Sequence, residues 1–342
     1  MSTATTHTYD FSWAPAGWKL PPGVPAWTQY FAKAVPNPVV PIDDIRACLP
    51  SSASKLVWAP SYDDGPSPYT HIITDYLHSK NLRASFYTVG SVAIQYPQTL
   101  LDTYLAGHEI GIHTWSHPDL RSITDDNQVI AELVYSAKAI YQVTGQVPRY
   151  YRPPYGFTNE RIRRLAATMG LKAVWVSLDT LDWVNVNSNP TQVVPAVTST
   201  FSKYVSQGLN NQISLEHDVY SPTANAAVAS LDILLKAGYT IQSIHECLGE
   251  STPYNNTILE GFFRSGVFES KNLAIQNPPP LPAILTDPLA FGIGNTSSII
   301  ATNATITTNS SALVASVVPP TKSGGSRVVF GWSILTVMFG FL

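Results

Sequence analysis

Charge and cysteine are both scarce in this 342-residue chain. Only 13% of the residues are charged and the formal net charge is −3, so the chain lacks the basic face that nucleic-acid binding usually requires. We therefore expect no nucleic-acid partner. The pattern Gly-x-Ser-x-Gly is also absent, which removes the usual setting of a nucleophilic serine and disfavours a serine esterase.

The chain has only two cysteines, Cys48 and Cys247, which lie far apart in the sequence. In an oxidising compartment a disulfide between them would stabilise the fold by roughly 4 to 5 kcal/mol on the chain-entropy model, an upper figure. The alternative is a pair of free, buried thiols. The signs of secretion described below favour the disulfide.

Aromatic residues and prolines, in contrast, are plentiful. Eight Trp and 17 Tyr suit a protein that stacks on sugar rings, although most aromatic side chains belong to cores. The 27 prolines crowd toward both ends of the chain. We interpret residues 1–47 as an irregular arm that packs on the folded domain through Trp18, Trp27 and Tyr30.

Between residues 48 and 250, short apolar runs alternate with longer amphipathic ones. This alternation predicts an α/β fold, a distorted (β/α) barrel of about seven parallel strands with helices outside and active residues at the carboxyl ends of the strands. The candidate strands are 56–59, 84–89, 109–113, 150–152, 173–178, 213–217 and 240–244. The candidate helices are 69–79, 92–106, 127–142, 159–169, 190–206 and 223–236.

The last part of the chain has a composition that cannot bury a core. Residues 251–327 are rich in Pro, Ser, Thr and Asn, which predicts a disordered stalk. The glycosylation sequons begin at Asn255, Asn295, Asn303 and Asn309, and the last three cluster in this stalk. Residues 328–342 form an apolar tail too short for a comfortable membrane span, the pattern of a signal exchanged for a glycolipid (GPI) anchor.

The opening MSTATTHTYD has neither the basic nor the apolar region of a signal peptide. An anchor signal requires entry into the secretory pathway, which conflicts with the missing signal-peptide pattern at the start of the sequence. We resolve this in favour of secretion and expect a truncated or mis-started N-terminus. The expected location is extracellular, in the cell wall or on the outer face of the plasma membrane.

Two adjacent carboxylates, Asp63 and Asp64, end the first candidate strand and precede a Gly-Pro turn. Alone, this segment is an ordinary solvated corner. Adjacent residues of a strand point in opposite directions, however, so one acid can bind a cation while the other moves a proton. His113 and His117 are four residues apart, a spacing that places both on one face of a helical turn and suits shared metal ligation.

Three further strand ends carry polar or aromatic residues. Arg152 precedes a Pro-Pro-Tyr-Gly turn that presents Tyr155, and an arginine of this kind can keep a catalytic carboxylate ionised; alone, it is an ordinary surface arginine. Asp182 and Trp183 follow the next strand. His217 ends the one after that, and a carboxylate such as Asp182 could hold its ring protonated for general-acid catalysis.

These five segments, in this order, resemble the five motifs of polysaccharide deacetylases of the NodB-homology type, carbohydrate esterase family four. The quoted segments are Ser61–Pro66, His113–His117, Arg152–Gly156, Asp179–Trp183 and Ile213–Asp218. The spacing and the distant cysteines are most similar to those of fungal chitin deacetylases. The resemblance covers residues 48 to 250.

The resemblance implies a role for each residue. Asp63 would be the general base and Arg152 would orient it, while Asp64, His113 and His117 would hold one divalent metal. Zinc is the expected ion and cobalt is possible. The backbone N–H of Tyr155 would stabilise the oxyanion. His217, held by Asp182, would protonate the leaving amine, and Trp183 and Leu215 would line the acetyl pocket.

The implied reaction is hydrolysis of N-acetyl groups on the N-acetylglucosamine units of chitin by a monomeric enzyme. Ser61 stands where threonine is usual and Tyr62 where phenylalanine is common, and Pro60 is unusual inside a strand. Two alternatives stay open. One is a deacetylase of another wall polymer, such as acetylxylan or a mixed glycan; the other is a catalytically silent glycan-binding protein of the wall.

Overall fold

The computed structural model describes residues 8–41, 43–51 and 55–270. Within these residues the strands form one parallel sheet in the order β5-β4-β3-β2-β1-β7-β6, and β8 pairs with the start of β1. The strands are β1 (Val57–Asp63), β2 (Ser85–Thr88), β3 (Glu109–Ile112), β4 (Tyr150–Tyr151), β5 (Lys172–Ala173), β6 (Leu178–Asp179), β7 (Gln212–His217) and β8 (Thr240–Ile241). The predicted distorted barrel of about seven parallel strands is confirmed.

The two ends of the strand order lie on one stretch of chain, residues 172–179. Its first part pairs with β4 and its last part pairs with β7. The single strand predicted at 173–178 is therefore two short strands, because Ile45 of the N-terminal arm bridges Val174 at the point between them. Ala47 bridges Gln212 of β7, so the arm completes the curved sheet at this gap.

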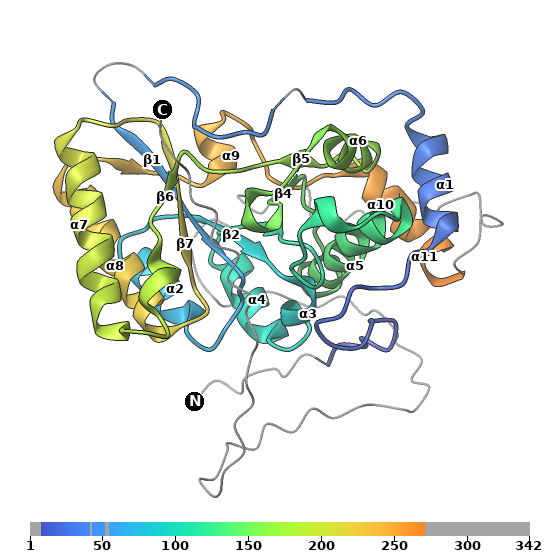
Figure 1. The fold of residues 1–342 in the computed structure, drawn as a ribbon, viewed down its shortest axis with the longest axis horizontal. Helices are drawn as coiled ribbons and strands as arrows, with labels where there is room; N and C mark the ends of the chain where they lie inside the picture. The colour runs from blue at the N-terminus through green and yellow to red at the C-terminus, as the bar shows by residue number, and fades with distance from the viewer. Residues whose placement is uncertain (1–7, 42, 52–54, 271–342) are drawn as a thin grey trace, which may run out of the picture. The chain divides into compact units, whose positions relative to one another are not determined.

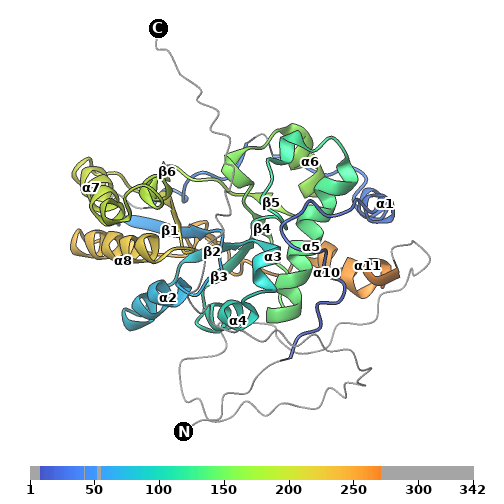
Figure 2. The same ribbon diagram turned by 60° about the horizontal axis from the view of Figure 1, so that its bottom comes forward.

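Helices cover the outside of the sheet (Figures 1 and 2). Helices α7, α8 and α2 lie on one side and α5, α6, α10 and α1 on the other. The helices are α1 (Pro25–Ala34), α2 (Thr70–Ser79), α3 (Gly90–Ala93), α4 (Pro97–Leu105), α5 (Asp126–Thr144), α6 (Glu160–Thr168), α7 (Val193–Ser206), α8 (Ser221–Lys236), α9 (Ile244–Cys247), α10 (Thr257–Arg264) and α11 (Val267–Ser270). The Asn159 side chain caps α6 by accepting from the N–H of Ile162.

The arm is not irregular throughout, because it contains α1. Pro25 occupies the first turn of this helix, where no N–H is needed. Trp27 is fully buried and packs against Phe262 of α10 and Phe268 of α11. Trp18, which we expected to pack on the domain, is instead 55% exposed. The folded part of the chain thus extends to at least residue 270, beyond the boundary expected at 250.

Apolar side chains fill the inside of the curved sheet. Alternate residues of the strands, such as Val57 and Ala59 or Ile213 and Leu215, belong to one buried cluster, as expected when every second side chain points to the same face. Strand β1 continues through Pro60, and its pairing with β2 begins only at Ser61. The proline therefore leaves the strand that ends at Asp63 intact.

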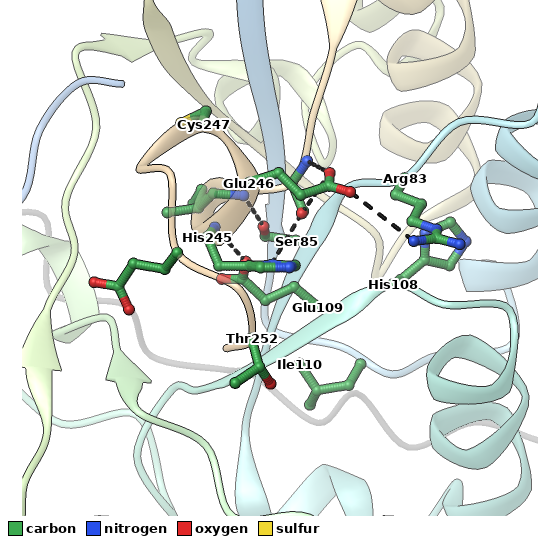
Figure 3. A network of polar contacts seen from close by, with 12 residues as sticks. Arg83, Ser85, His108, Glu109, Ile110, His245, Glu246, Cys247 and Thr252 are labelled. Atoms are coloured by element: carbon green, nitrogen blue, oxygen red, sulfur yellow. Dashed lines mark hydrogen bonds and ion pairs between the residues drawn. The ribbon is translucent and has the colours of Figure 1, made fainter. Parts of the chain in front are cut away.

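A polar network closes the amino-terminal end of the strands (Figure 3). The Glu109 carboxylate accepts from the N–H of His245 at 2.8 Å, and the Ser85 hydroxyl accepts from the N–H of Ile244 at 2.8 Å. Both acceptors satisfy the first turn of the short helix α9. Cys247 at the end of α9 forms the predicted disulfide with Cys48. The network and the disulfide together hold α9 against this end of the barrel.

Candidate active site

Polar side chains from five strand ends converge at the opposite, carboxyl end of the sheet. Asp63 ends β1 and His217 ends β7, and the two residues are paired in register. His113 directly follows β3 and Arg152 directly follows β4. Asp182 comes three residues after β6. Since the strands are parallel, their carboxyl ends meet at one edge, as the sequence predicted.

Asp64, His113 and His117 form a group able to hold a metal ion, with their ligand atoms all within 4.8 Å of one another. Asp64 Oδ1 lies 3.3 Å from His113 Nε2 and 3.2 Å from His117 Nε2. This oxygen is buried and has no hydrogen-bond partner among the described residues. A buried acceptor between two imidazole nitrogens fits a divalent cation that all three would ligate.

The two histidines are prepared for ligation through Nε2. His113 Nδ1 lies 2.8 Å from the carbonyl oxygen of Arg152, so the proton belongs on Nδ1 and the lone pair on Nε2 faces Asp64. Burial lowers the pKa of His117 to about 4, although the Asp64 carboxylate opposes the shift. Neutral imidazoles and one carboxylate are a donor set typical of zinc and related divalent metals.

Asp63 points at Arg152 and is separate from the metal group's own contacts. Arg152 Nη1 donates to Asp63 Oδ1 at 2.6 Å and Nη2 donates to the Ser61 hydroxyl at 2.9 Å. Arg152 is fully buried and Asp63 is 2% exposed. The two side chains thus form a direct, buried ion pair. The other Asp63 oxygen, Oδ2, lies 3.7 Å from His113 Nε2.

His217 is oriented by Asp182 on the other side of the site. Asp182 Oδ1 lies 2.7 Å from His217 Nδ1, and Oδ2 accepts from the backbone N–H of His217 at 2.8 Å. Burial lowers the pKa of His217, but the charge and hydrogen bond of the Asp182 carboxylate, together with the negative charges of Asp64 and Asp63, raise it to about 10. His217 Nε2 lies 4.0 Å from Asp64 Oδ2. The ring therefore presents a protonated Nε2 to the same space as the metal group.

The chain is similar in sequence and in fold to known proteins. A family model described as polysaccharide deacetylase matches residues 51–174. The structure of the chitin deacetylase from the fungal pathogen Colletotrichum lindemuthianum is similar, with a TM-score of 0.56 and 27% identity over 64% of this chain and 97% of that chain. The chain carries a polysaccharide deacetylase domain. The resemblance inferred from the five motifs is thus confirmed.

Curated fungal relatives match the same region. Chitin deacetylase 1 of Cryptococcus neoformans is 39% identical over 58% of this chain, and the match covers 45% of that protein. Chitin deacetylase of Amylomyces rouxii is 35% identical over 62% of this chain, and the match covers 51% of that protein. The chain thus spans about half the length of these relatives.

The loop that joins His113 and His117, the two candidate metal ligands, does not form the helical turn that their spacing predicts. Residues 113–118 contain no helix, and Thr114 and His117 have left-handed backbones with φ of 64° and 58°. This loop brings both rings to Asp64 although it is not helical. Asp64, Tyr155 and Leu181 of the deacetylase site share this unusual backbone, with φ of 75°, 60° and 57°. Such strained positions gather where a site demands a particular geometry.

Glu132 of α5 holds this loop, and sequence reasoning missed it. Its carboxylate accepts from the N–H groups of Trp115 and Ser116 at 2.7 and 2.9 Å and from the Ser116 hydroxyl at 2.5 Å. The side chain is fully buried, and burial raises its pKa to about 7 in spite of these hydrogen bonds. A single acidic residue within the apolar run 129–135 was the signal that could have revealed it.

Replacing Glu132 by Ala is expected to weaken metal binding as well as folding. Two buried N–H groups would lose their acceptor, at a cost of about 2 to 4 kcal/mol, and the freed loop would lower metal affinity roughly 10- to 100-fold. Zinc competition titrations and thermal unfolding would measure both. Glu132→Gln is the matched control, since it keeps one acceptor oxygen and should lie between. An unchanged zinc affinity in Glu132→Ala would contradict this role.

Tyr87 of β2 supports the Asp63–Arg152 pair and was also missed. Its ring lies under the Arg152 guanidinium, 4.1 Å from ring centre to Cζ, a cation–π contact in a buried site. Gly111 of β3 makes room for the ring, because a Cβ there would lie 2.5 Å from Tyr87 carbons. Both residues lie inside strands, where a tyrosine or a glycine in the sequence gives no indication of a role in the site.

Three of the remaining predicted residues, Tyr155, Trp183 and Leu215, lie in or after strands at the carboxyl end of the sheet, which forms the mouth of the barrel. Tyr155 is 47% exposed and Trp183 is 54% exposed, whereas Leu215 is buried inside the barrel. The Tyr155 ring lies 4.8 Å from the His117 ring. Asn255 is exposed, as its glycosylation would require. The sequons at Asn295, Asn303 and Asn309 and the apolar tail 328–342 lie outside the described residues.

Proposed function

We propose that this deacetylase domain hydrolyses N-acetyl groups of N-acetylglucosamine units in chitin, releasing acetate and leaving glucosamine. The observation that carries the proposal is a group of three candidate metal ligands that lies beside two different groups able to transfer protons. Asp63, paired with Arg152, lies beside His113, and His217, paired with Asp182, lies beside Asp64. The names of the fungal relatives support chitin as the polymer.

The residues Asp64, His113 and His117 would hold one divalent ion, with zinc the expected metal and cobalt possible. Such an ion supplies Lewis acidity that polarises the amide carbonyl and makes a water molecule more acidic. Two histidines and one carboxylate leave coordination positions open for water and substrate. The side chains and backbone of the protein itself perform the proton transfers and stabilise the oxyanion.

Asp63 acts as the general base that takes a proton from the attacking water. Its buried ion pair with Arg152 fixes the orientation of the carboxylate, so that the proton moves to a group already in place. Ser61 and Tyr87 hold the guanidinium from its other sides. These neighbours restrict Arg152 to the orientation that its partner requires.

The backbone N–H of Tyr155 stabilises the oxyanion as the carbonyl becomes tetrahedral. The carbon–nitrogen bond then breaks, and His217 Nε2 donates a proton to the departing amine of the sugar. Trp183 and Leu215 enclose the acetyl methyl group. Hydrolysis is thereby divided between a base on β1 and an acid on β7, two adjacent strands.

Asp182→Asn is expected to shift the alkaline limit of activity to lower pH. His217 must be protonated to act as the acid, and Asp182 makes the largest contribution among the carboxylates that raise its pKa to about 10. Without that negative charge the pKa falls, so the protonated fraction is lost at lower pH. The kcat/KM profile between neutral and alkaline pH would show it. An alkaline limit that stays where it is would mean that His217 is not the acid.

The direct test of the proposed function is acetate release from chitin oligomers and colloidal chitin by the zinc-loaded protein. Release of acetate with matching free amines on the product is expected. Absence of acetate from every chitin substrate would overturn the proposal.

We further propose an extracellular location, in the cell wall or on the outer face of the plasma membrane, for a monomeric protein. The disulfide between Cys48 and Cys247 supports an oxidising compartment. The sequons and the apolar tail support glycosylation and a glycolipid anchor. No helix among residues 8–41, 43–51 and 55–270 has the length and apolar character to cross a membrane.

A further inference from the structure

Exposed apolar side chains gather around the mouth of the site. Among the described residues, seven of the large exposed hydrophobic side chains follow the carboxyl ends of strands: Tyr69, Tyr155, Phe157, Leu181, Trp183, Val184 and Tyr220. Exposed aromatic faces are costly to leave in water and are suited to stacking on flat apolar ligands. Phe157 is the one of these whose surroundings define a binding surface most fully.

Phe157 belongs to a continuous row of rings that begins at the metal group. The His117 ring contacts the Tyr155 ring with 4.8 Å between centroids, and the Tyr155 ring lies 5.7 Å from the Phe157 ring. Arg121 completes the row, with its guanidinium carbon 3.8 Å from the centre of the Phe157 ring. The row leads from the reacting centre outward along one side of the mouth.

The Arg121 guanidinium is fixed and its charge is compensated. Its Nε and Nη2 donate to the two oxygens of Asp119 at 3.0 and 2.9 Å. The Arg121 side chain is 41% exposed, and its Nη1 has no hydrogen-bond partner among the described residues, so this nitrogen can donate to a ligand. A planar arginine–carboxylate pair offers both donors and acceptors in one plane. Because the pair is neutral as a whole, it matches an uncharged, hydroxyl-rich ring better than an anionic group.

The two loops that build this surface are tied together before any ligand arrives. Arg161 of α6 donates to the carbonyl of Ile123 at 2.9 Å and to Asp126 at 2.7 Å, which joins the segment after Phe157 to the segment after Arg121. Leu120, beside Arg121, is fully buried. A surface held in this way binds with little loss of conformational entropy.

We propose that Phe157 and Arg121 form a subsite for an uncharged sugar unit next to the one that is deacetylated. This inference rests on the proposed function and adds to it the side of the mouth along which the polymer runs. The sugar ring stacks on the exposed surface formed by Phe157 and Arg121. Nη1 of Arg121 and the Asp119 oxygens bind the hydroxyl or amide groups of the sugar. The subsite makes a long oligomer a better substrate than a short one.

The test compares acetate release from chitobiose and chitopentaose by the unchanged protein, Phe157→Ala and Arg121→Lys. The subsite predicts that the unchanged protein has a higher kcat/KM on the longer oligomer. Phe157→Ala should reduce this ratio about tenfold, chiefly through KM, as expected for the loss of one stacking contact. Arg121→Lys keeps the charge but loses the flat surface, so it should reduce the ratio in the same direction.

Trp18→Ala is the control, because Trp18 is also an exposed aromatic residue but lies in the N-terminal arm. It should leave the ratio unchanged. The same loss on both oligomers in Phe157→Ala, or no preference for length in the unchanged protein, would overturn the subsite while acetate release still supports the proposed function.

If no chitin oligomer releases acetate, the proposed function fails. The subsite is then tested by measuring the binding of chitopentaose by calorimetry. Chitopentaose would be titrated into zinc-loaded Asp63→Asn with and without Phe157→Ala. Weaker binding caused by Phe157→Ala supports the subsite, and equal binding overturns it. Thermal unfolding of each variant checks that the change is local.

Discussion

Asp63→Asn is expected to reduce kcat by two to four orders of magnitude while the protein still binds its metal. The amide has nearly the shape of the carboxylate but cannot accept a proton. Asp63 takes no part in the group formed by Asp64, His113 and His117, so the affinity for zinc should change little. Acetate release and metal content, measured on the same preparation, check both halves of the expectation.

The neighbouring Asp64→Asn is the matched control for this prediction. The two residues are adjacent, and each carries a carboxylate, but only Asp64 Oδ1 lies between the two histidine nitrogens. Asp64→Asn should lose metal and activity together, whereas Asp63→Asn should lose activity alone. If Asp63→Asn kept its turnover, or if both variants lost metal equally, the division of roles between them would be wrong.

Removal of the metal with a chelator is expected to abolish acetate release, and addition of zinc or cobalt should restore it. The expectation follows from the donor set: one buried carboxylate oxygen without a partner and two imidazole nitrogens. Loss of the ion leaves no Lewis acid for the amide carbonyl, which is worth several kcal/mol of barrier. Activity assays would be paired with elemental analysis of the stripped and reloaded protein.

Two observations separate loss of the metal from loss of the fold. The disulfide and the apolar interior of the barrel do not depend on the ion, so the stripped protein should keep its circular dichroism spectrum. Full activity in protein shown to be free of metal would contradict the mechanism.

The convergence of the candidate site residues could be predicted from the sequence because each of them follows a strand of a recognisable kind. Asp63, His113, Arg152 and His217 end or directly follow runs of apolar residues. In a parallel sheet such positions must converge at one edge. The chemistry of the residue types then narrows the function, since two histidines beside paired acids suit a metal-dependent hydrolase.

What could not be predicted depends on contacts between distant parts of the chain. The strand expected at 173–178 is interrupted because Ile45, more than a hundred residues earlier, bridges Val174. Helices α10 and α11 lie within residues 251–270, which the composition assigned to the stalk. They are stable because Phe262 and Phe268 pack on Trp27, and tertiary burial of this kind overrides local composition.

The shape of the loop 113–118, which carries His113 and His117, could not be predicted either, because it also depends on a contact with a distant residue. A spacing of four residues favours a helical turn when nothing else acts on the chain. Here the buried carboxylate of Glu132 accepts from two consecutive backbone N–H groups, Trp115 and Ser116, and so organises the loop outside any helix. The sequence indicates which residues could hold a metal, whereas a contact with α5 determines the shape of the loop that carries the two histidines.

The central claim is that the domain cleaves the amide of an N-acetylglucosamine unit, and one measurement tests it most directly. Zinc-loaded protein would be incubated with chitin oligomers and, separately, with acetylxylan, with Asp63→Asn as the blank, and the acetate released would be quantified. The account predicts acetate from the chitin oligomers, with one free amine formed for each acetate. Acetate from acetylxylan alone, or none above the Asp63→Asn blank, would contradict it.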